Sequence, residues 1–147
     1  MSVTVRPLEP SDRADWGRLW EGYLAFYETE RPAAHFDAYF RRLLVRDPAD
    51  MQGLIAEVDG RAAGLAHYLF HPHGWQAEPT CYLQDLFADP AVRGAGVGRA
   101  LIEAVYAAAD AGGARGVYWT TAADNRQARQ LYDRIGRLTP FVKYARA

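Results

Sequence analysis

The sequence predicts an α/β fold with a mixed central sheet of about six to seven strands flanked by four helices. Strand-like apolar segments alternate along the chain with segments whose apolar residues recur at helical spacing. A strand at 80–88, a helix at 96–111 and a strand at 117–121 would form a βαβ unit with a right-handed crossover. The 147 residues suffice for one sizeable core, so we expect residues 1–147 to form a single domain.

The first half of the chain is predicted to contain one strand, two helices and a hairpin. Pro10 and the polar residues after it mark a helix start, and aromatic and leucine side chains at helical spacing extend that helix. A second apolar helical face ends at Pro48, and the Asp59-Gly60 pair suits a two-residue hairpin turn. The expected segments are a strand at 3–7, helices at 12–28 and 36–46, and hairpin strands at 52–58 and 61–70.

The second half is predicted to alternate between strands and helices. The strand at 80–88 is apolar on both faces and therefore central. Gly112 and Gly113 end the helix that follows it, and Asp124-Asn125 supplies an N-cap for the last helix. The expected segments are strands at 80–88, 117–121 and 138–144, the last interrupted by Pro140, and helices at 96–111 and 125–135.

Composition excludes several classes of function. Half of the residues are hydrophobic and the net charge is −1, with no cluster of Lys and Arg, so we expect no nucleic-acid partner. No apolar run reaches the length of a membrane span, and the first ten residues lack a signal-peptide core, so we expect no membrane partner. The single cysteine, Cys81, suits a reducing cytoplasm and is interpreted as a small buried hydrophobe.

Three glycines at alternate positions, Gly94, Gly96 and Gly98, stand where the central strand gives way to a helix. Without Cβ atoms, backbone N–H groups there can approach a ligand, and a helix N-terminus favours anions. We therefore predict a pyrophosphate cradle of main chain, with Arg93 and Arg99 as nearby cations. A glycine-rich turn without a ligand is the alternative. No Lys-Ser/Thr follows Gly98, which excludes a P-loop, and position 99 is not the third glycine of a dinucleotide fingerprint.

The turn at 26–32 mixes aromatic and acidic side chains before a proline. Tyr27 and Glu28 could bind a cationic amine by cation–π contact and carboxylate pairing, although a solvated acidic loop is the alternative interpretation. His71 and His73 lie two residues apart without a third ligand, so we interpret them as loop residues and expect no metal.

Two motifs together resemble the GNAT superfamily of N-acyltransferases. The first is Arg93-x-x-Gly96-x-Gly98, and the second is the Asn-x-x-Ala-x-x-Leu-Tyr segment from Asn125 to Tyr132. Their order along the chain, and the elements on which they lie, match that superfamily. The resemblance covers the element order of roughly the whole chain and extends to motifs from 83 to 144.

The resemblance implies acetyl-CoA as a cosubstrate. Three strand residues would pair through their main chain with the pantetheine arm, the glycine stretch would hold the pyrophosphate, and Asn125 would contact the arm. Tyr132 would lie near the thioester sulfur and protonate the leaving thiolate. The expected cofactor-binding residues are Leu86, Phe87, Ala88, Arg93, Gly94, Ala95, Gly96, Val97, Gly98, Arg99 and Asn125.

The candidates for removing a proton from the amine are Asp85 and a water held near Gln84 and Asp85. Several small-amine acetyltransferases of the superfamily have Glu at the place of Gln84, and Gln cannot act as a base. Strand alternation would put Gln84 and Asp85 on opposite faces, so at most one should face the amine. We predict Tyr132 and Asp85 as catalytic residues, leaving open a purely structural role for Asp85. Tyr27, Glu28 and Gln84 are the expected substrate contacts.

The implied function is transfer of an acetyl group from acetyl-CoA to the primary amine of a small molecule, by direct attack in a ternary complex. A non-catalytic acyl-CoA-binding module is one alternative, which Tyr132 disfavours because a binder needs no acid there. A protein lysine or N-terminal acetyltransferase is another. The family likeness and the aromatic-rich surface also make a homodimer plausible.

Overall fold

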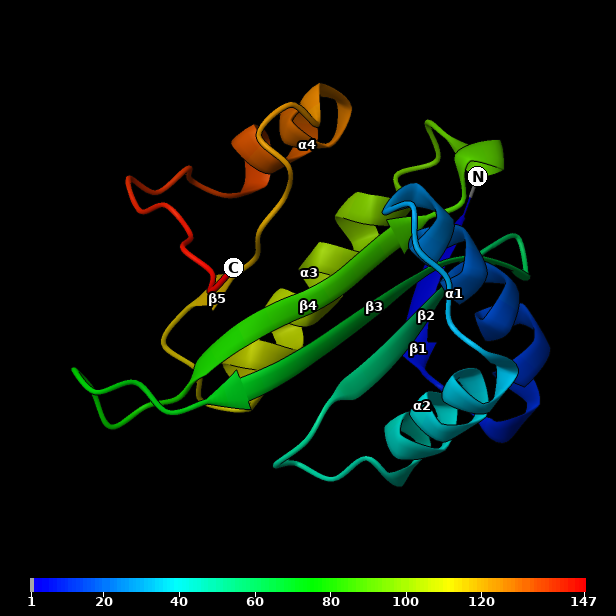
Figure 1. Ribbon diagram of the computed structural model, residues 1–147, viewed down its shortest axis with the longest axis horizontal. Coiled ribbons are helices and arrows are strands. Elements are labelled where there is room, and N and C mark those ends of the chain that lie inside the picture. Colours follow the sequence, from blue (N-terminus) through cyan, green and yellow to red (C-terminus); the bar gives the residue numbers. More distant parts are fainter. Residues whose placement is uncertain (1) are drawn as a thin grey trace.

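Five strands form one sheet in the part of the chain that the computed structural model describes, residues 2–147 (Figure 1). Met1, the first residue of the expected domain, lies outside the described residues. β1 to β4 pair antiparallel with their neighbours, and β5 pairs parallel to β4. The strands are β1 (Val3–Pro7), β2 (Gln52–Val58), β3 (Arg61–His71), β4 (Thr80–Ala88) and β5 (Val117–Tyr118). The α/β fold with a mixed sheet is confirmed.

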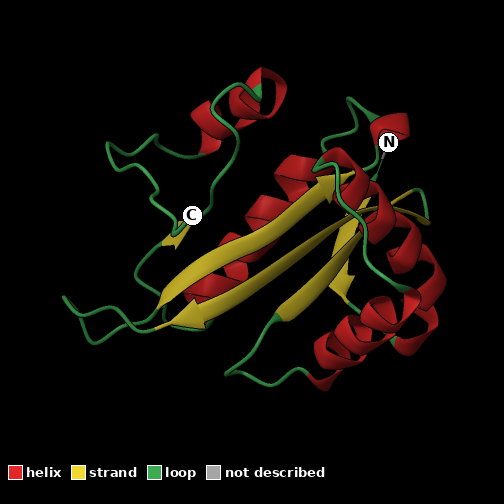
Figure 2. Cartoon of the chain, in the orientation of Figure 1, coloured by secondary structure: helices red, strands yellow, loops and turns green. Residues whose placement is uncertain are grey.

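The helices of the described chain cover both faces of the sheet (Figures 1 and 2). They are α1 (Arg13–Phe26), α2 (Ala33–Val45), α3 (Val97–Ala111) and α4 (Arg126–Ile135), with short 3₁₀ turns η1 (Pro10–Asp12) and η2 (Pro90–Val92). α3 buries Leu101 and Val105 on one face, whereas α1 and α2 bury Trp16 and Leu43 in a second cluster on the other face. The sheet therefore separates two cores.

β4 and β5 lie side by side only where they begin. Their pairing is limited to Cys81 with Val117 and Tyr82 with Tyr118, and the chain after β5 then runs away from β4 toward α4 (Figure 1). Within the described residues, the edge of β4 from Leu83 onward has no strand beside it. Its main-chain polar groups are therefore available to an extended ligand.

A β-bulge interrupts β4 at Gln84. In the pairing with β3, His67 lies opposite Asp85 and Tyr68 opposite Leu83, so Gln84 is the extra residue. Leu83 and Leu86, three residues apart, both pack into the α3 core. The bulge therefore shifts the alternation of faces by one residue, which strict period-2 reasoning did not foresee.

The strand expected at 138–144 is wrong, which reduces the sheet from six to seven strands to five among the residues described. Residues 137–147 contain no helix or strand and expose Leu138, Phe141, Val142 and Tyr144. Pro140 lacks an N–H for a ladder, and residues 137–147 pair with no strand among the residues described. The strand expected at 117–121 is likewise limited to Val117–Tyr118.

Between residues 2 and 147, no helix has both the length and the apolar character needed to cross a bilayer.

Candidate active site

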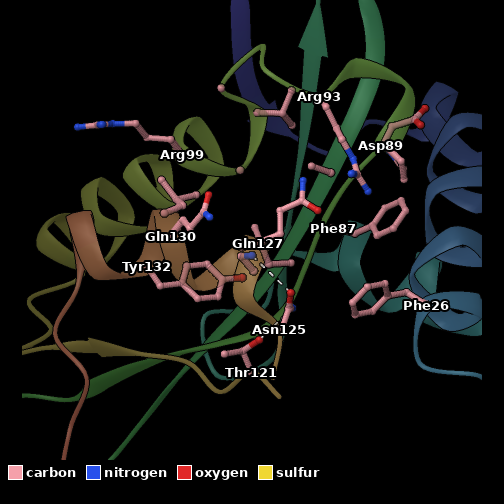
Figure 3. A pocket seen from close by; sticks show the side chains of 18 of the residues that line it. Phe26, Phe87, Asp89, Arg93, Arg99, Thr121, Asn125, Gln127, Gln130 and Tyr132 are labelled. Carbon is pink, nitrogen blue, oxygen red and sulfur yellow. Dashed lines mark hydrogen bonds between the residues drawn. The ribbon is translucent and has the colours of Figure 1, made fainter. Parts of the chain in front are cut away.

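A cavity of about 540 Å³ lies between the end of β4, the loop after it, the start of α3 and α4 (Figure 3). We call it the first cavity. It brings together most of the residues that the sequence assigned to cofactor binding, although they come from three separate segments. Those that line it are Leu86, Phe87, Ala88, Arg93, Gly94, Gly96, Val97, Gly98, Arg99 and Asn125, joined by Tyr27 and Tyr132. Ala95 is not among the lining residues.

The glycine loop presents main chain to this cavity. Gly94 and Gly96 have φ values of 82° and 81°, the left-handed region that other residues enter only with strain. Gly96 is the N-cap of α3 and provides no side-chain cap, so the first-turn N–H groups of α3 are left for a ligand. Gly98 is helical, and a Cβ there would come 3.4 Å from Leu131 of α4. Two glycines therefore shape the loop, whereas an added Cβ at the third would make ordinary contact with α4.

The two arginines of the loop differ in orientation. Figure 3 shows the side chain of Arg93 pointing into the cavity and that of Arg99 pointing away from it. Arg99 Nε instead donates to Glu103 Oε1 at 2.8 Å along the surface of α3. Arg93 is therefore the better-placed cation for an anion in the cavity.

Asn125 and Tyr132 point into the same space from the start of α4 and from its second turn (Figure 3). The Asn125 side chain caps α4 by accepting from the Ala128 N–H at 3.4 Å, and its amide donates to Thr121 Oγ1 at 3.2 Å. Burial, with a smaller contribution from Tyr27, raises the pKa of Tyr132 to about 12. The Tyr132 hydroxyl therefore keeps its proton at neutral pH and can donate it.

A second cavity, of about 380 Å³, lies between α1, α2 and the bulge of β4. Its lining residues are Trp20, His35, Ala38, Tyr39, Arg42, Met51, Gln84 and Asp85. Because both Gln84 and Asp85 line it, the expectation that these side chains face opposite sides of the strand is wrong. The bulge at Gln84 is the cause, since it turns two consecutive residues toward α1 and α2.

Asp85 belongs to a buried hydrogen-bonded network that the sequence did not reveal. Trp16 Nε1 donates to His67 Nε2 at 3.0 Å, and His67 Nδ1 lies 2.8 Å from Asp85 Oδ2. An indole N–H can only donate, so Nε2 of His67 accepts, and Nδ1 carries the proton that it donates to Asp85. The Tyr39 hydroxyl donates to the same Oδ2 at 2.9 Å.

This network keeps Asp85 ionised. Burial, which leaves Asp85 only 5% exposed, would by itself raise its pKa. Hydrogen bonds from His67, Tyr23 and Tyr39 outweigh burial and lower the pKa below its ordinary value. The carboxylate is therefore a fixed negative charge at the wall of the second cavity.

The aromatic turn after α1 contributes one predicted contact to the first cavity. Tyr27 lines that cavity, whereas Glu28 lines neither cavity. Glu28 adopts a φ of 56° and closes α1, its N–H donating to the Ala25 carbonyl at 2.9 Å. Gln84 is exposed at the second cavity.

Several lining residues were missed by sequence reasoning. Tyr23 was interpreted as part of an aromatic helix face and Phe26 as part of the turn at 26–32, and Thr121, Gln127 and Gln130 carry no motif of their own. His67 and Tyr39 were likewise hidden within ordinary strand and helix patterns, because their partners lie far away in sequence. For Gln127 and Gln130, a position on the cavity-facing side of α4 was the only available signal.

Comparison with known proteins places this architecture in a family. The model of the acetyltransferase (GNAT) family matches residues 16–136. The chain is 37% identical over 147 residues to the D-amino-acid N-acetyltransferase HPA3 of Saccharomyces cerevisiae, covering 98% of this chain and 90% of the relative. It is 31% identical over 110 residues to an aminoglycoside N(6')-acetyltransferase type 1 of Stenotrophomonas maltophilia, covering 71% of this chain and 65% of the relative.

A solved structure of the aminoglycoside acetyltransferase AAC(6')-Iy with a CoA-containing bisubstrate analog has the same fold. It superimposes with a TM-score of 0.84 at 22% identity, over 100% of this chain and 99% of that one. The family match spans most of the residues that form the sheet, the first cavity and the glycine loop. The chain therefore belongs to the GNAT family of acetyltransferases and is an acyltransferase enzyme.

Proposed function

We propose that this enzyme transfers the acetyl group of acetyl-CoA to the primary amine of a small molecule, by direct attack in a ternary complex. The observation that carries the proposal is the first cavity, where an unpaired strand edge and an uncapped helix N-terminus face one space. The strand edge can pair with the extended pantetheine arm of CoA, and the helix N-terminus can bind its diphosphate. The AAC(6')-Iy neighbour also holds CoA in a solved complex.

In this proposal the chain holds the cosubstrate mainly through its backbone. The unpaired edge at Leu86, Phe87 and Ala88 pairs with the pantetheine arm. The N–H groups of the loop from Arg93 to Arg99 hold the diphosphate, with the Arg93 guanidinium beside it. Asn125, placed by its cap, gives its remaining amide hydrogen to the arm.

Acetyl-CoA supplies an activated acyl group, whose carbon gains a bond to nitrogen while its bond to sulfur breaks. β4 N–H groups at the free edge stabilise the oxyanion, and the Tyr132 hydroxyl donates to the departing sulfur. An ordinary thiol has a pKa of about 8.5, so complete proton transfer from a tyrosine of pKa about 12 to an exposed thiolate would cost about 5 kcal/mol. Burial of the sulfur lowers this cost, because burial raises the pKa of the thiol toward that of Tyr132.

The amine approaches from the bulge of β4. The fixed charge of Asp85 holds the ammonium group there, and a water near Gln84 carries away the proton that the nitrogen must lose before attack. Because its pKa is lowered, Asp85 is better suited to anchor a positive charge than to accept a proton. In this proposal Tyr27, which lines the first cavity, contacts the acceptor, and Glu28 attracts its positive charge from outside both cavities.

The relatives support a small acceptor, since their names record action on D-amino acids and on aminoglycosides. The test is acetyl transfer from acetyl-CoA to a panel of amino acids, polyamines and aminoglycosides, followed by free thiol release and mass spectrometry. We expect acetylated product with at least one small amine. Acetylation of peptide lysines or N-termini alone, with every small amine left unmodified, would contradict the proposal.

A homodimer is part of the proposal. In the described residues, β5 is the last strand of the sheet, and the segment 137–147 exposes Leu138, Phe141, Val142 and Tyr144. An apolar segment beside a sheet edge suits pairing with a second copy of the chain.

A further inference from the structure

Two buried nitrogen atoms at the second cavity have no hydrogen-bond partner within residues 2–147. They are Nε1 of Trp20 and Nε2 of His35. Trp20 is only 5% exposed, and both residues line the cavity. Buried polar atoms of this kind are uncommon because a lost hydrogen bond to water is not replaced. A ligand that brought hydrogen-bond acceptors to these atoms would satisfy them.

The Trp20 indole is fixed in position and can only donate. Its ring stacks on Tyr23, with centroids 4.8 Å apart, and meets Tyr39 edge-on at 5.1 Å. One turn earlier on α1, the Trp16 indole is satisfied by His67. The two tryptophans thus differ: the Trp16 indole has a hydrogen-bond partner among the described residues, whereas the Trp20 indole has none.

The cavity also has a cationic residue in its lining. Arg42 lines it, and its Nε and Nη2 bond Asp50, whereas Nη1 is outside that pair. His35 lies 6.2 Å from Trp20 between ring centroids and completes the cluster. Indole, imidazole and guanidinium donors together match the two oxygens of a carboxylate.

The cavity also has an anionic residue in its lining. Asp85 presents an ionised carboxylate there, beside the carboxamide of Gln84. Leu86, the next residue along β4, already lines the first cavity. Since a strand advances only about 3.3 Å per residue, a group held at Asp85 would lie close to the bound thioester. A molecule with an anion at one end and an ammonium group at the other fits this arrangement.

We propose that the second cavity is the acceptor site and that the acceptor is an amino acid. Its carboxylate receives hydrogen bonds from Trp20 Nε1 and His35 Nε2 and faces Arg42, and its amino group lies at Asp85. The proposal rests on the function proposed above and adds the class of acceptor. It assigns specificity to α1 and α2, which lie outside both sequence motifs.

Matched acceptors provide the kinetic test. Phenylalanine and methionine, each as D and L enantiomers, are compared with their carboxamides and with the amines that lack the carboxyl group. We expect kcat/KM to be at least about tenfold higher for one enantiomer of the acid than for the carboxamide or the amine, because the unpaired donors select the carboxylate. Trp20→Phe, His35→Phe and Arg42→Gln should each bring that ratio toward one. Arg41→Gln, an exposed neighbour that lines neither cavity, should retain it.

A second measurement does not depend on turnover. The indole N–H signals of the four tryptophans are assigned by single substitution and followed by NMR while amino acid is added to the CoA complex. The Trp20 signal should shift as its N–H gains an acceptor, and the carboxyl-free amine should leave it in place. The Trp75 signal serves as the internal reference, because Trp75 is 90% exposed and lines neither cavity.

The outcomes separate the two proposals. Acetylation of small amines without preference for the carboxylate, together with an unmoved Trp20 signal, would overturn the acceptor assignment and leave the transferase function standing. A Trp20 shift without acetylation of any amine would support the carboxylate site and contradict the proposed reaction. If Trp20→Phe fails to fold, His35→Phe and the wild-type NMR titration still decide the question.

Discussion

The hydroxyl of Tyr132 is the single group on which thiolate release is proposed to depend. It points into the first cavity and keeps its proton, since burial raises the pKa of Tyr132 to about 12. We expect Tyr132→Phe to lower kcat by roughly 100-fold, the lower end of what a positioned acid contributes. The dissociation constant of CoA, measured by calorimetry, should change less than about twofold, because the ring remains.

Tyr144→Phe is the matched control, because the Tyr144 side chain is 91% exposed and lies outside the first cavity. It should leave kcat and CoA affinity as in the wild type. A Tyr132→Phe enzyme with wild-type kcat would show that the departing sulfur takes its proton from elsewhere.

Asp85 belongs to the proposed acceptor site and also contributes to the free energy of unfolding. Its pKa in the fold lies below the ordinary 3.8, so its ionised form favours the native state. That contribution is fully present above about pH 4 and is lost as the pH falls through the native pKa. We expect Asp85→Asn to lower the free energy of unfolding by about 1–3 kcal/mol at pH 6–8, the cost of a disrupted buried bond. Urea unfolding should show this difference shrinking below pH 4.

Asp110→Asn, at an exposed position near the end of α3, controls for the loss of a negative charge. It should change stability little at any pH. A deficit in Asp85→Asn that grew as the pH fell would mean that the carboxyl is held in its protonated form, contrary to the network geometry.

At the scale of elements, CoA binding should depend on the backbone conformation of the loop that precedes α3. Gly96 has a φ of 81° with open space around it, so an added Cβ meets no atom but strains the backbone. Left-handed backbone costs an ordinary residue about 1–2 kcal/mol, which relaxation of the loop would relieve. We therefore expect Gly96→Ala to weaken CoA binding about tenfold by calorimetry.

Gly60 offers a matched control in the turn between β2 and β3. Its φ is 83°, also with open space around it, and it lies outside the first cavity. Gly60→Ala should cost similar stability and leave CoA affinity unchanged. Equal affinities for wild type, Gly60→Ala and Gly96→Ala would remove the loop from the binding site.

Local chemistry explains which elements the sequence could predict. Turn residues such as Asp59-Gly60 and the cap at Asn125 act within a few positions, so the hairpin and the start of α4 were found correctly. The bulge at Gln84 has no glycine or proline to mark it, and it arises from the pairing of β4 with β3. The network of Asp85 joins residues 18 to 51 positions apart, beyond the reach of any local pattern.

At the scale of the whole molecule, the two motifs placed the chain in its family, but the C-terminal segment was misjudged. Its apolar residues suggested a strand, but residues 137–147 pair with no strand among the described residues. Strand pairing depends on contacts between distant segments or between chains, which a local sequence pattern does not record. The acceptor cavity was also out of reach, because it forms only where α1, α2 and β4 meet.

The proposed homodimer is tested on the same segment. We expect light scattering after size exclusion to give twice the chain mass of 16.4 kDa at micromolar concentration. The combined change Leu138→Ser, Phe141→Ser and Val142→Ser should shift the population to monomer, because it removes the exposed apolar surface. The control is Val45→Ser, an exposed apolar position at the end of α2 and outside the segment 137–147. A wild-type monomer, or an unchanged dimer in the triple variant, would contradict the proposal.

The most direct test of the central claim is a crystal structure of the protein with CoA bound. We predict the diphosphate against the N–H groups of residues 93–99, the pantetheine arm along the free edge of β4, and the sulfur beside the Tyr132 hydroxyl. CoA bound away from the glycine loop and β4, or no binding at saturating concentration, would contradict the account.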